Sequence, residues 1–395
     1  MIPATASAGA QSNKRVMLVC GEPSGDQLGA QLMRGLKALA PDVAISGVGG
    51  PAMAREGLVS LFPLDDTAVM GLREVVPAIP RILKRVKQAT DFALKTRPDA
   101  VVLIDSPDFT HRIAHAIKTR DPSLKTVNYV APQVWASRSY RTKQMAHDFD
   151  LVLALFPFEV PFLKKYGLRA EFVGHPVTER AARMTGGGAL RARLEIGPEA
   201  PLLALLPGSR SNEIRFILPV FREVLAMLAA RIPGLVTVLP TVPHVAQKVQ
   251  AATAGWPTPL HILHGEDDKF AAFNAADVAL AASGTVTAEL ALARTPMVVG
   301  YRVGGLTYAL SSLIMNVKYI TLVNVLLERE AVPEFLQSRL KPPTLAGALE
   351  KLLRDPMART EQQAALAEFD RLLGEGTEAP SLRAARALLD FVAKG

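Results

Sequence analysis

The sequence predicts an α/β fold made of two halves, each a doubly wound parallel sheet with helices on both faces. Its strands are short, continuously apolar runs, such as residues 100–104 and 202–206, and this pattern is typical of parallel strands buried on both faces. Each run ends at glycine, proline or a polar residue, and a helical pattern follows. The alternation begins anew at Leu202, and a length of 395 residues suits two domains better than one.

The composition is that of a globular protein with anionic partners. Apolar residues make up 49% of the chain, charged residues 21%, and the formal net charge is +8, which favours nucleotides, phosphorylated substrates or an anionic membrane surface. Nucleic acid is not an expected partner, because zinc-ligand spacings, basic helical runs and ribonucleoprotein-type aromatic motifs are all missing. The single cysteine, Cys20, excludes an intramolecular disulfide and is expected to be a buried core residue.

The ends of the chain suggest no membrane-spanning element. Residues 1–14 are small and polar, without the basic and apolar regions of a signal peptide, and are expected to form a disordered tail. No stretch reaches the roughly 18 apolar residues that span a bilayer. Any membrane contact is therefore expected to be peripheral.

The first strand, residues 16–20, leads into a loop with candidate catalytic groups. Glu22, Ser24 and Asp26 follow it at the carboxyl end of the strand, among glycines that let the backbone approach a ligand. The loop is neither a P-loop nor a dinucleotide fingerprint. Its acids suit sugar hydroxyls or proton transfer, and helix capping by Ser24 or Asp26 is the simpler alternative.

Residues 68–87 form a basic amphipathic segment. Its apolar positions recur at helical spacing, and Arg81, Lys84, Arg85 and Lys87 occupy the other side. Such a helix can lie in a membrane interface or pack on a sheet with its lysines solvated. The apolar residues that would contact a membrane or an acyl chain are Met70, Leu72, Val75, Val76, Ile79 and Ile82.

Asp105 directly follows the buried strand at residues 100–104. A carboxylate at the carboxyl end of a strand faces the crevice of an open α/β sheet, where a general base is expected. Asp108 is a candidate helix cap.

The rest of the first half is expected to contain further strands at 126–130 and 151–155. His175 is expected to be a hinge or capping residue. Gly186–Gly188 is expected to form a flexible linker.

Two corners in the second half have the character of anion sites. The strand at 202–206 runs into Gly208, Ser209 and Arg210, with Glu213 in the helix that begins there. The first amides of that helix and the guanidinium suit a phosphate, although an ordinary turn with a surface arginine is an equal alternative. A strand at 276–282 then closes on a second corner, Ser283-Gly284-Thr285, with Glu289 placed to hold a ribose diol; a capping box is the alternative here.

The last part of the chain has one clear strand at residues 296–302, then a polar patch with Asn324 and Arg329, and helices from about Pro343 on. No convincing metal site emerges, since the run Glu266-Asp267-Asp268 reads as a solvated loop. Phosphates would be served by positive groups and helix ends, so no cofactor or metal is expected.

Taken together, these motifs resemble the lipid A disaccharide synthase family of glycosyltransferases. The matching residues are Gly21-Glu22-x-Ser24-Gly25-Asp26, Met70-Gly71, Ile104-Asp105-x-Pro107-Asp108-Phe109, Val134-Trp135-Ala136, Gly174-His175-Pro176, Leu206-Pro207-Gly208-Ser209-Arg210-x-x-Glu213, Ser283-Gly284-Thr285 with Glu289, Val298-Val299-Gly300-Tyr301-Arg302, and Asn324 with Glu330. They occur in order over nearly the whole chain after the tail.

The resemblance implies two Rossmann-like domains facing across a cleft, the GT-B arrangement. Residues 15–178 would form the acceptor and membrane side, joined by C-terminal helices at 355–395, and residues 179–354 would bind the UDP-sugar. The expected reaction is inverting transfer of 2,3-diacylglucosamine from UDP-2,3-diacylglucosamine to 2,3-diacylglucosamine 1-phosphate, which gives the β(1→6) disaccharide 1-phosphate and UDP. Both substrates carry acyl chains, so the resemblance implies peripheral attachment to the cytoplasmic face of the inner membrane, now favours a membrane role for residues 68–87, and leaves a homodimer as one possible assembly.

Roles follow for the candidate residues. Asp105 would be the general base for the acceptor hydroxyl, with Glu22 and Asp26 orienting the acceptor or stabilising positive charge. The residues expected to bind substrate or nucleotide are Ser24, Gly208, Ser209, Arg210, Glu213, Ser283, Gly284, Thr285, Glu289, Tyr301, Asn324 and Arg329.

The sequence departs from the family at two positions. Ser137 stands where a second tryptophan is common, and Pro23 stands where threonine is common. Two other functions stay open: another UDP-sugar enzyme of the same fold, such as a UDP-N-acetylglucosamine epimerase, and a noncatalytic lipid- or nucleotide-binding protein. Loss of turnover with retained ligand binding on substitution of Asp105 would separate catalysis from binding.

Overall fold

The computed structural model describes residues 14–67, 72–132, 140–302, 318–374 and 378–394. The predicted tail up to residue 13, Met70 and the motif Val134-Trp135-Ala136 with Ser137 lie outside the described residues. The chain divides into two compact units. One holds the residues up to Pro176 together with those from Glu378 on, and the other holds the residues between them.

The first unit contains a six-stranded parallel sheet in the order β2-β1-β3-β4-β5-β6. Its strands are β1 (Arg15–Cys20), β2 (Ala44–Val48), β3 (Ala100–Ile104), β4 (Thr126–Tyr129), β5 (Leu151–Ala154) and β6 (Ala170–Phe172). Cys20 pairs with Ile104, and Ile104 pairs with Tyr129, so β1, β3 and β4 end at the same level. The loops that follow them therefore meet at one edge of the sheet.

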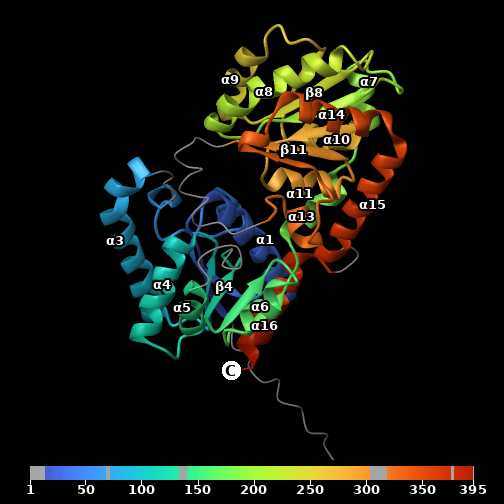
Figure 1. Cartoon of the computed structure of the whole chain (residues 1–395). Helices are drawn as coiled ribbons and strands as arrows, with labels where there is room; N and C mark the ends of the chain where they lie inside the picture. The colour runs from blue at the N-terminus through green and yellow to red at the C-terminus, as the bar shows by residue number, and fades with distance from the viewer. Residues whose placement is uncertain (1–13, 68–71, 133–139, 303–317, 375–377, 395) are drawn as a thin grey trace, which may run out of the picture. The chain divides into compact units, whose positions relative to one another are not determined.

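The helices of the first unit are α1 (Pro23–Leu39), α2 (Pro51–Arg55), α3 (Leu72–Thr96), α4 (Pro107–Arg120), α5 (Tyr140–Asp148) and α6 (Glu159–Lys164), with a 3₁₀ turn η1 (Leu64–Asp66). Figure 1 shows α3, α4 and α5 as neighbouring helices beside the sheet, where they bury residues such as Val101 and Ile113 in a common core. The chain returns to this unit at its end, because α16 (Pro380–Ala393) packs along α1 (Figure 1). A Cβ atom at Gly35 would lie 2.5 Å from the carbonyl oxygen of Ser381, so this contact needs glycine.

The second unit repeats the architecture with the strand order β12-β11-β10-β7-β8-β9. Its strands are β7 (Leu202–Leu206), β8 (Val236–Thr241), β9 (Leu260–His264), β10 (Val278–Ala281), β11 (Met297–Tyr301) and β12 (Glu334–Leu336). Its helices are α7 (Gly187–Arg193), α8 (Ser211–Ala229), α9 (Pro243–Thr253), α10 (Glu266–Ala275), α11 (Thr285–Leu292), α13 (Leu322–Leu327), α14 (Pro342–Arg354) and α15 (Pro356–Leu373), with 3₁₀ turns η2 (Pro176–Arg183) and η3 (Gln337–Arg339). Leu205, Phe221 and Leu345 lie in the core that α8, α9 and α14 form with this sheet.

The predicted fold class is confirmed: both halves are parallel sheets flanked by helices. The last helices divide between the units, since α15 packs on α11, α13 and α14 of the second unit and α16 packs on the first. The short edge strand β12 escaped prediction because its three residues carry no long apolar run.

Two local predictions were wrong. Gly186–Gly188 is not a flexible linker, because it starts α7, and a Cβ at Gly187 would lie 2.7 Å from the backbone of Asn274 and Ala275. The acids Glu266–Asp268 do not form a solvated loop but the first turn of α10, where a negative charge is favourable. They pair with Arg183 and Arg193.

Candidate functional site

Asp105 lies on a strained turn at the carboxyl end of β3. Its φ is 53° and that of Ser106 is 46°, two consecutive left-handed residues that are not glycine. Such a conformation costs about 1–3 kcal/mol per residue and persists where surrounding structure enforces it. Here the amide of Asp105 donates to the carbonyl of Tyr129 (3.0 Å), and the hydroxyl of Thr110 donates to the carbonyl of Asp105 (2.6 Å). The turn holds the half-buried side chain of Asp105 at the carboxyl end of β3.

Ser24 is the partner of that carboxylate. Its Oγ donates a 2.8 Å hydrogen bond to Oδ2 of Asp105. The approach depends on two glycines, since a Cβ at Gly21 would lie 2.9 Å from Cβ of Ser106, and one at Gly25 would lie 2.9 Å from Cβ of Cys20. Within the described residues, Ser24 is the only group that hydrogen bonds to the Asp105 carboxylate, which leaves its other oxygen able to take a proton.

The carboxylate of Asp26 is buried and hydrogen bonds to the protein backbone. Its side chain is 3% exposed and accepts from the amides of Gly50 (2.7 Å), Ala52 (2.8 Å) and Met53 (3.0 Å). It therefore caps the start of α2, which satisfies a buried charge with backbone donors. Glu22 is half-buried at the N-cap position of α1, and its carbonyl accepts from the amide of Asp26.

Cys20 ends β1 directly beneath this loop and is fully buried, as the sequence predicted. Burial raises the pKa of its thiol far above the ordinary value, and the negative charges of Asp26 and Asp105 add to the effect. The thiol is therefore a neutral packing group.

In the second unit, Glu213 fills the corner after β7. Its Oε2 accepts from the amides of Ser209 (2.9 Å) and Arg210 (3.1 Å), and its Oε1 accepts from the Arg210 guanidinium (3.0 Å). Gly208 makes this possible, because its φ is +106° and a Cβ there would lie 2.2 Å from Oε2 of Glu213. The sequence suggested the first amides of this helix for a phosphate. The amides of Ser209 and Arg210, which come just before α8 begins at Ser211, already hold a carboxylate.

Tyr301, at the end of β11, also reaches Glu213. Its hydroxyl lies 3.4 Å from Oε1 of Glu213 and donates to it. Burial raises the pKa of Tyr301, and the charge of Glu213 raises it further, partly offset by Arg210. Tyr301 is therefore a stable hydrogen-bond donor that helps to fix Glu213 and, through it, Arg210.

The second corner lies next to the first, because β10 pairs with β7. Gly284 has φ +150°, and a Cβ there would meet nothing within 4 Å, so the space in front of this turn is open. Ser283 is half-buried, while Gly284 and Thr285 are exposed where α11 begins.

One turn into α11, the Glu289 carboxylate is 5% exposed and is held by two cations. Lys269 Nζ lies 2.9 Å from its Oε2, and Arg180 Nη1 lies 3.1 Å from its Oε1. Arg180 comes from η2 and Lys269 from α10.

Asn324 and Arg329 are engaged elsewhere in the second unit. Asn324 is fully buried; its amide donates to the carbonyl of Val332 (2.7 Å) and to Glu334 (2.8 Å) and accepts from two backbone amides. Arg329 forms an ion pair of 2.5 Å with Glu368 of α15, both of them exposed, and this pair raises the pKa of Arg329 and lowers that of Glu368. The hydrogen bonds of Asn324 and the ion pair of Arg329 thus join the segment between β11 and β12 to other parts of the second unit.

The amphipathic segment forms the start of α3. Ala78 and Val86 are buried and Ile82 packs partly on the core, whereas Ile79 and Leu83 are 45% and 48% exposed. Met70 and the side chains of Leu72, Val75 and Val76 lie outside the described residues. Within the described part of the chain, no helix combines the length and apolar character needed to cross a bilayer.

Comparison with known proteins identifies the family. A family model described as lipid-A-disaccharide synthetase matches residues 16–387. The lipid-A-disaccharide synthase of Rhodospirillum centenum (strain ATCC 51521 / SW) is 46% identical over 380 residues, covering 96% of this chain and 95% of that protein. The chain belongs to the lipid-A-disaccharide synthase family. The family's enzyme from Rhodopseudomonas palustris (strain HaA2) is 42% identical over 396 residues and covers all of both chains.

Solved structures of low sequence identity have the same fold as this chain. UDP-GlcNAc 2-epimerase from Neisseria meningitidis, bound to UDP-GlcNAc, superposes with a TM-score of 0.64 at 11% identity over 97% of this chain and 100% of that one. MurG from Acinetobacter baumannii gives 0.56 at 15% identity over 97% and 100%. These similarities confirm the GT-B-like fold, and the family match confirms a glycosyltransferase.

Sequence reasoning missed four residues that set this geometry. Thr110 fixes the Asp105 turn, Arg180 and Lys269 hold Glu289, and His244 donates from Nε2 to the carbonyl of Ser209 (2.7 Å). A carbonyl can only accept, so this contact sets the tautomer of His244. Thr110 had a local signal, as the hydroxyl five residues after Asp105, whereas the other contacts join segments far apart in the chain.

Proposed function

We propose that the protein transfers 2,3-diacylglucosamine from UDP-2,3-diacylglucosamine to 2,3-diacylglucosamine 1-phosphate, with inversion at the anomeric carbon. The observation that carries this proposal is the Asp105 carboxylate at the carboxyl end of β3, held by Ser24 on a left-handed turn. Family membership supports the choice of substrates. The products are the β(1→6) disaccharide 1-phosphate and UDP.

Asp105 acts as the general base in this proposal. The acceptor 6-hydroxyl oxygen attacks the anomeric carbon, its proton passes to Asp105, and the bond from that carbon to the diphosphate oxygen breaks with its electron pair leaving on UDP. The strained turn supports this role, because strain of this kind gathers at functional sites. Asp26 lies in the first turn of α1 with Ser24 and caps α2, and is thus a positioning residue. Glu22, at the start of α1, remains a candidate for contacting the acceptor.

The leaving UDP is proposed to bind at the corner after β10 rather than on the amides after β7. The amides of Ser209 and Arg210 already serve Glu213, whereas the turn at Gly284 is open and begins a helix whose first amides favour an anion. Arg210 is 67% exposed on its side chain and can turn from Glu213 toward the diphosphate of the neighbouring corner. Ser283 and Thr285 supply hydroxyl groups there. Together with the first amides of α11 and with Arg210, they would stabilise the negative charge that develops on the leaving UDP.

Glu289 is proposed to hold the ribose diol. Arg180 and Lys269 hold this carboxylate in one orientation, so that the two hydroxyl groups meet a fixed acceptor. Tyr301 supports the same half of the site by holding Glu213. Asn324 and Arg329 act at a distance here, by bracing the β11–β12 connection.

The start of α3 is proposed to contact the cytoplasmic face of the inner membrane. Ile79 and Leu83 lie one helical turn apart and are exposed, and Arg81, Lys84 and Lys87 are exposed near them. An apolar stripe flanked by cations suits the interface of an anionic bilayer. This placement would bring both acylated substrates to the enzyme within the membrane surface.

The deciding experiment is a mass-spectrometric assay with both acylated substrates in detergent, run on the wild type, Asp105→Ala and Asp105→Asn. Disaccharide 1-phosphate and UDP from the wild type alone, with UDP binding kept in both variants, support the proposed reaction and the base. Turnover retained by Asp105→Ala would refute the role of Asp105. Absence of product from the wild type, with UDP still bound, would favour an epimerase or a binding protein.

A further inference from the structure

Two histidines and an aspartate converge where α4 and α5 approach their ends in the first unit. Nδ1 of His115 lies 3.0 Å from Oδ1 of Asp148, and Nδ1 of His147 lies 2.8 Å from the same oxygen. Each residue offers one ligand atom, and the three lie within 4.8 Å of one another. We propose that His115, His147 and Asp148 form a binding site for a divalent transition-metal ion of the Zn²⁺ or Ni²⁺ type.

The two distances from the shared carboxylate oxygen suit such an ion. In an octahedral site with bonds of about 2.1 Å, neighbouring ligand atoms lie about 3.0 Å apart. The observed separations of 3.0 and 2.8 Å from the shared oxygen match that edge length. The histidine side chains are 54% and 64% exposed, so water can occupy the remaining positions.

The carboxylate is built into the fold in a way that favours a cation. The Asp148 side chain is 1% exposed, and its carbonyl accepts from the hydroxyl of Thr126 (2.7 Å). Among the described residues, the two histidines are the only hydrogen-bond partners of its carboxylate. A buried charge of this kind is costly unless an opposite charge compensates it.

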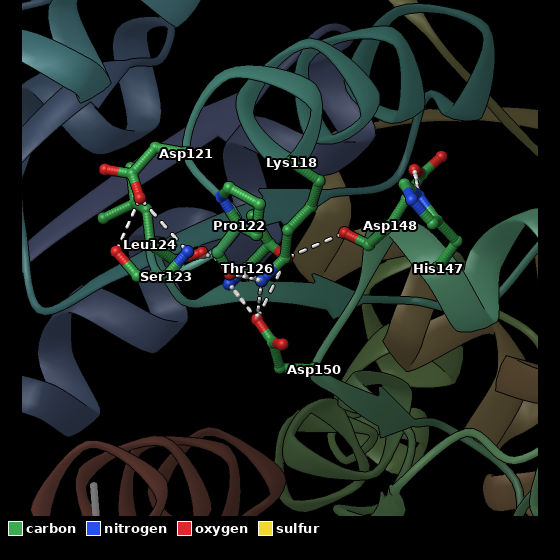
Figure 2. A network of polar contacts seen from close by, with 9 residues as sticks. All are labelled: Lys118, Asp121, Pro122, Ser123, Leu124, Thr126, His147, Asp148 and Asp150. Atoms are coloured by element: carbon green, nitrogen blue, oxygen red, sulfur yellow. Dashed lines mark hydrogen bonds and ion pairs between the residues drawn. The ribbon is translucent and has the colours of Figure 1, made fainter.

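Lys118, the nearby lysine, forms its hydrogen bonds with other partners than Asp148. Figure 2 shows His147 and Asp148 beside the contacts of Lys118, whose Nζ bonds Asp150 (2.7 Å) and the carbonyls of Pro122 (3.1 Å) and Leu124 (3.0 Å). Its charge therefore serves Asp150 and the turn before β4. A bound metal ion would place a positive charge directly beside Asp148.

The donor set selects the class of ion. Imidazole nitrogen suits Zn²⁺, Ni²⁺ and Cu²⁺, whereas Mg²⁺ and Ca²⁺ prefer oxygen ligands throughout. Both histidines would bind as neutral rings through Nδ1, with the proton of each carried on Nε2. The two hydrogen bonds to Asp148 are thereby exchanged for bonds to the ion.

The site lies away from the proposed catalytic edge. Asp148 ends α5 just before β5 begins at Leu151, whereas Asp105 follows the carboxyl end of β3. An ion there would join α4 to α5 as a structural clamp. Turnover should therefore not depend on it.

The test is a calorimetric titration of untagged full-length protein, freed of metal with EDTA and desalted, with ZnCl₂ and separately with MgCl₂. We expect one equivalent of Zn²⁺ to bind, a higher melting temperature with Zn²⁺, and no response to Mg²⁺. His115→Ala and His147→Ala should each weaken Zn²⁺ binding by at least about 10-fold, since even partners that only orient a ligand contribute that much. His264→Ala, an exposed histidine of the second unit, is the matched control and should bind as the wild type does.

Three outcomes would overturn the site. These are no saturable Zn²⁺ binding, binding unchanged in both histidine variants, or binding reduced equally by His264→Ala. Since both substituted histidines are exposed, unchanged circular dichroism should show that the variants fold. A disaccharide assay with and without Zn²⁺ tests the clamp role separately, and turnover that requires the ion would contradict it.

Discussion

Ser24 donates a 2.8 Å hydrogen bond to Asp105 across a separation of 81 residues. The contact joins the first turn of α1, which follows β1, to the turn after β3, and β1 and β3 are adjacent strands of the first sheet. It gives the proposed base a fixed orientation before substrate arrives, which is the usual role of a residue that supports a catalytic group.

The Ser24–Asp105 contact predicts a graded loss of activity. Asp105→Asn should lower kcat by about 10²–10⁴, the usual contribution of a general base. Ser24→Ala should lower kcat by only about 10–100-fold, because one hydrogen bond to a charged group contributes roughly 1.5–3 kcal/mol. Steady-state kinetics would check this, and a Ser24→Ala effect confined to KM would contradict the positioning role.

We predict that Gly208 is needed both for its positive φ and for the space that the Glu213 carboxylate occupies beside it. Gly208→Ala should destabilise the second unit more than Gly234→Ala, a matched change at φ +73° with nothing within 4 Å of the new Cβ. The added Cβ forces Glu213 away from two amides, and we expect an extra cost of about 1–3 kcal/mol. Denaturant unfolding of both variants measures the difference, and equal losses would show that only φ matters.

Cys20 predicts a dependence of stability on pH. Burial raises the pKa of the thiol in the folded state, so the folded chain keeps a proton that the unfolded chain releases near the ordinary value of 9.0. The contribution of the protonated thiol to the free energy of unfolding is present below pH 9.0. Above that pH it should fall by about 1.4 kcal/mol per pH unit. Unfolding at pH 8 and 10 beside Cys20→Ala isolates the effect, and Ellman's reagent should label Cys20 only after unfolding.

Glu289 predicts the strength of nucleotide binding. Glu289→Gln should weaken UDP binding by about 10-fold or more, because a charged acceptor is replaced by a neutral one beside two cations. Glu368→Gln is the control, since this acid of α15 pairs with Arg329 instead of lying at the proposed ribose site. Calorimetry with UDP compares them, and an equal loss in both variants would count against the ribose role.

The exposed face of α3 predicts a test of membrane contact. Ile79→Ser with Leu83→Ser should reduce sedimentation with anionic phospholipid vesicles, because both side chains are exposed and would lose apolar burial in the interface. Met357→Ser, at an 82% exposed position of the second unit, is the control. Vesicle binding that is unchanged in the double variant would remove α3 from the interface.

Much of the fold could be predicted because its signals are local. Runs such as 202–206 are apolar throughout, and only strands buried on both faces need that pattern. The position of Asp105 followed from the end of such a run. The three-residue strand β12 and the packed start of α7 could not be predicted, since each depends on partners from distant parts of the chain.

The sequence by itself determined the fold class, the family and the type of residue at each corner, because apolar periodicity and motif order are properties of the chain alone. The tertiary structure decided which partner each side chain meets. Glu213, rather than an incoming anion, occupies the Ser209 and Arg210 amides, and Asp26 caps α2 instead of pointing at a substrate. The physical reason is that a carboxylate binds whichever donors the folded backbone brings within about 3 Å, and only the packed chain sets that distance.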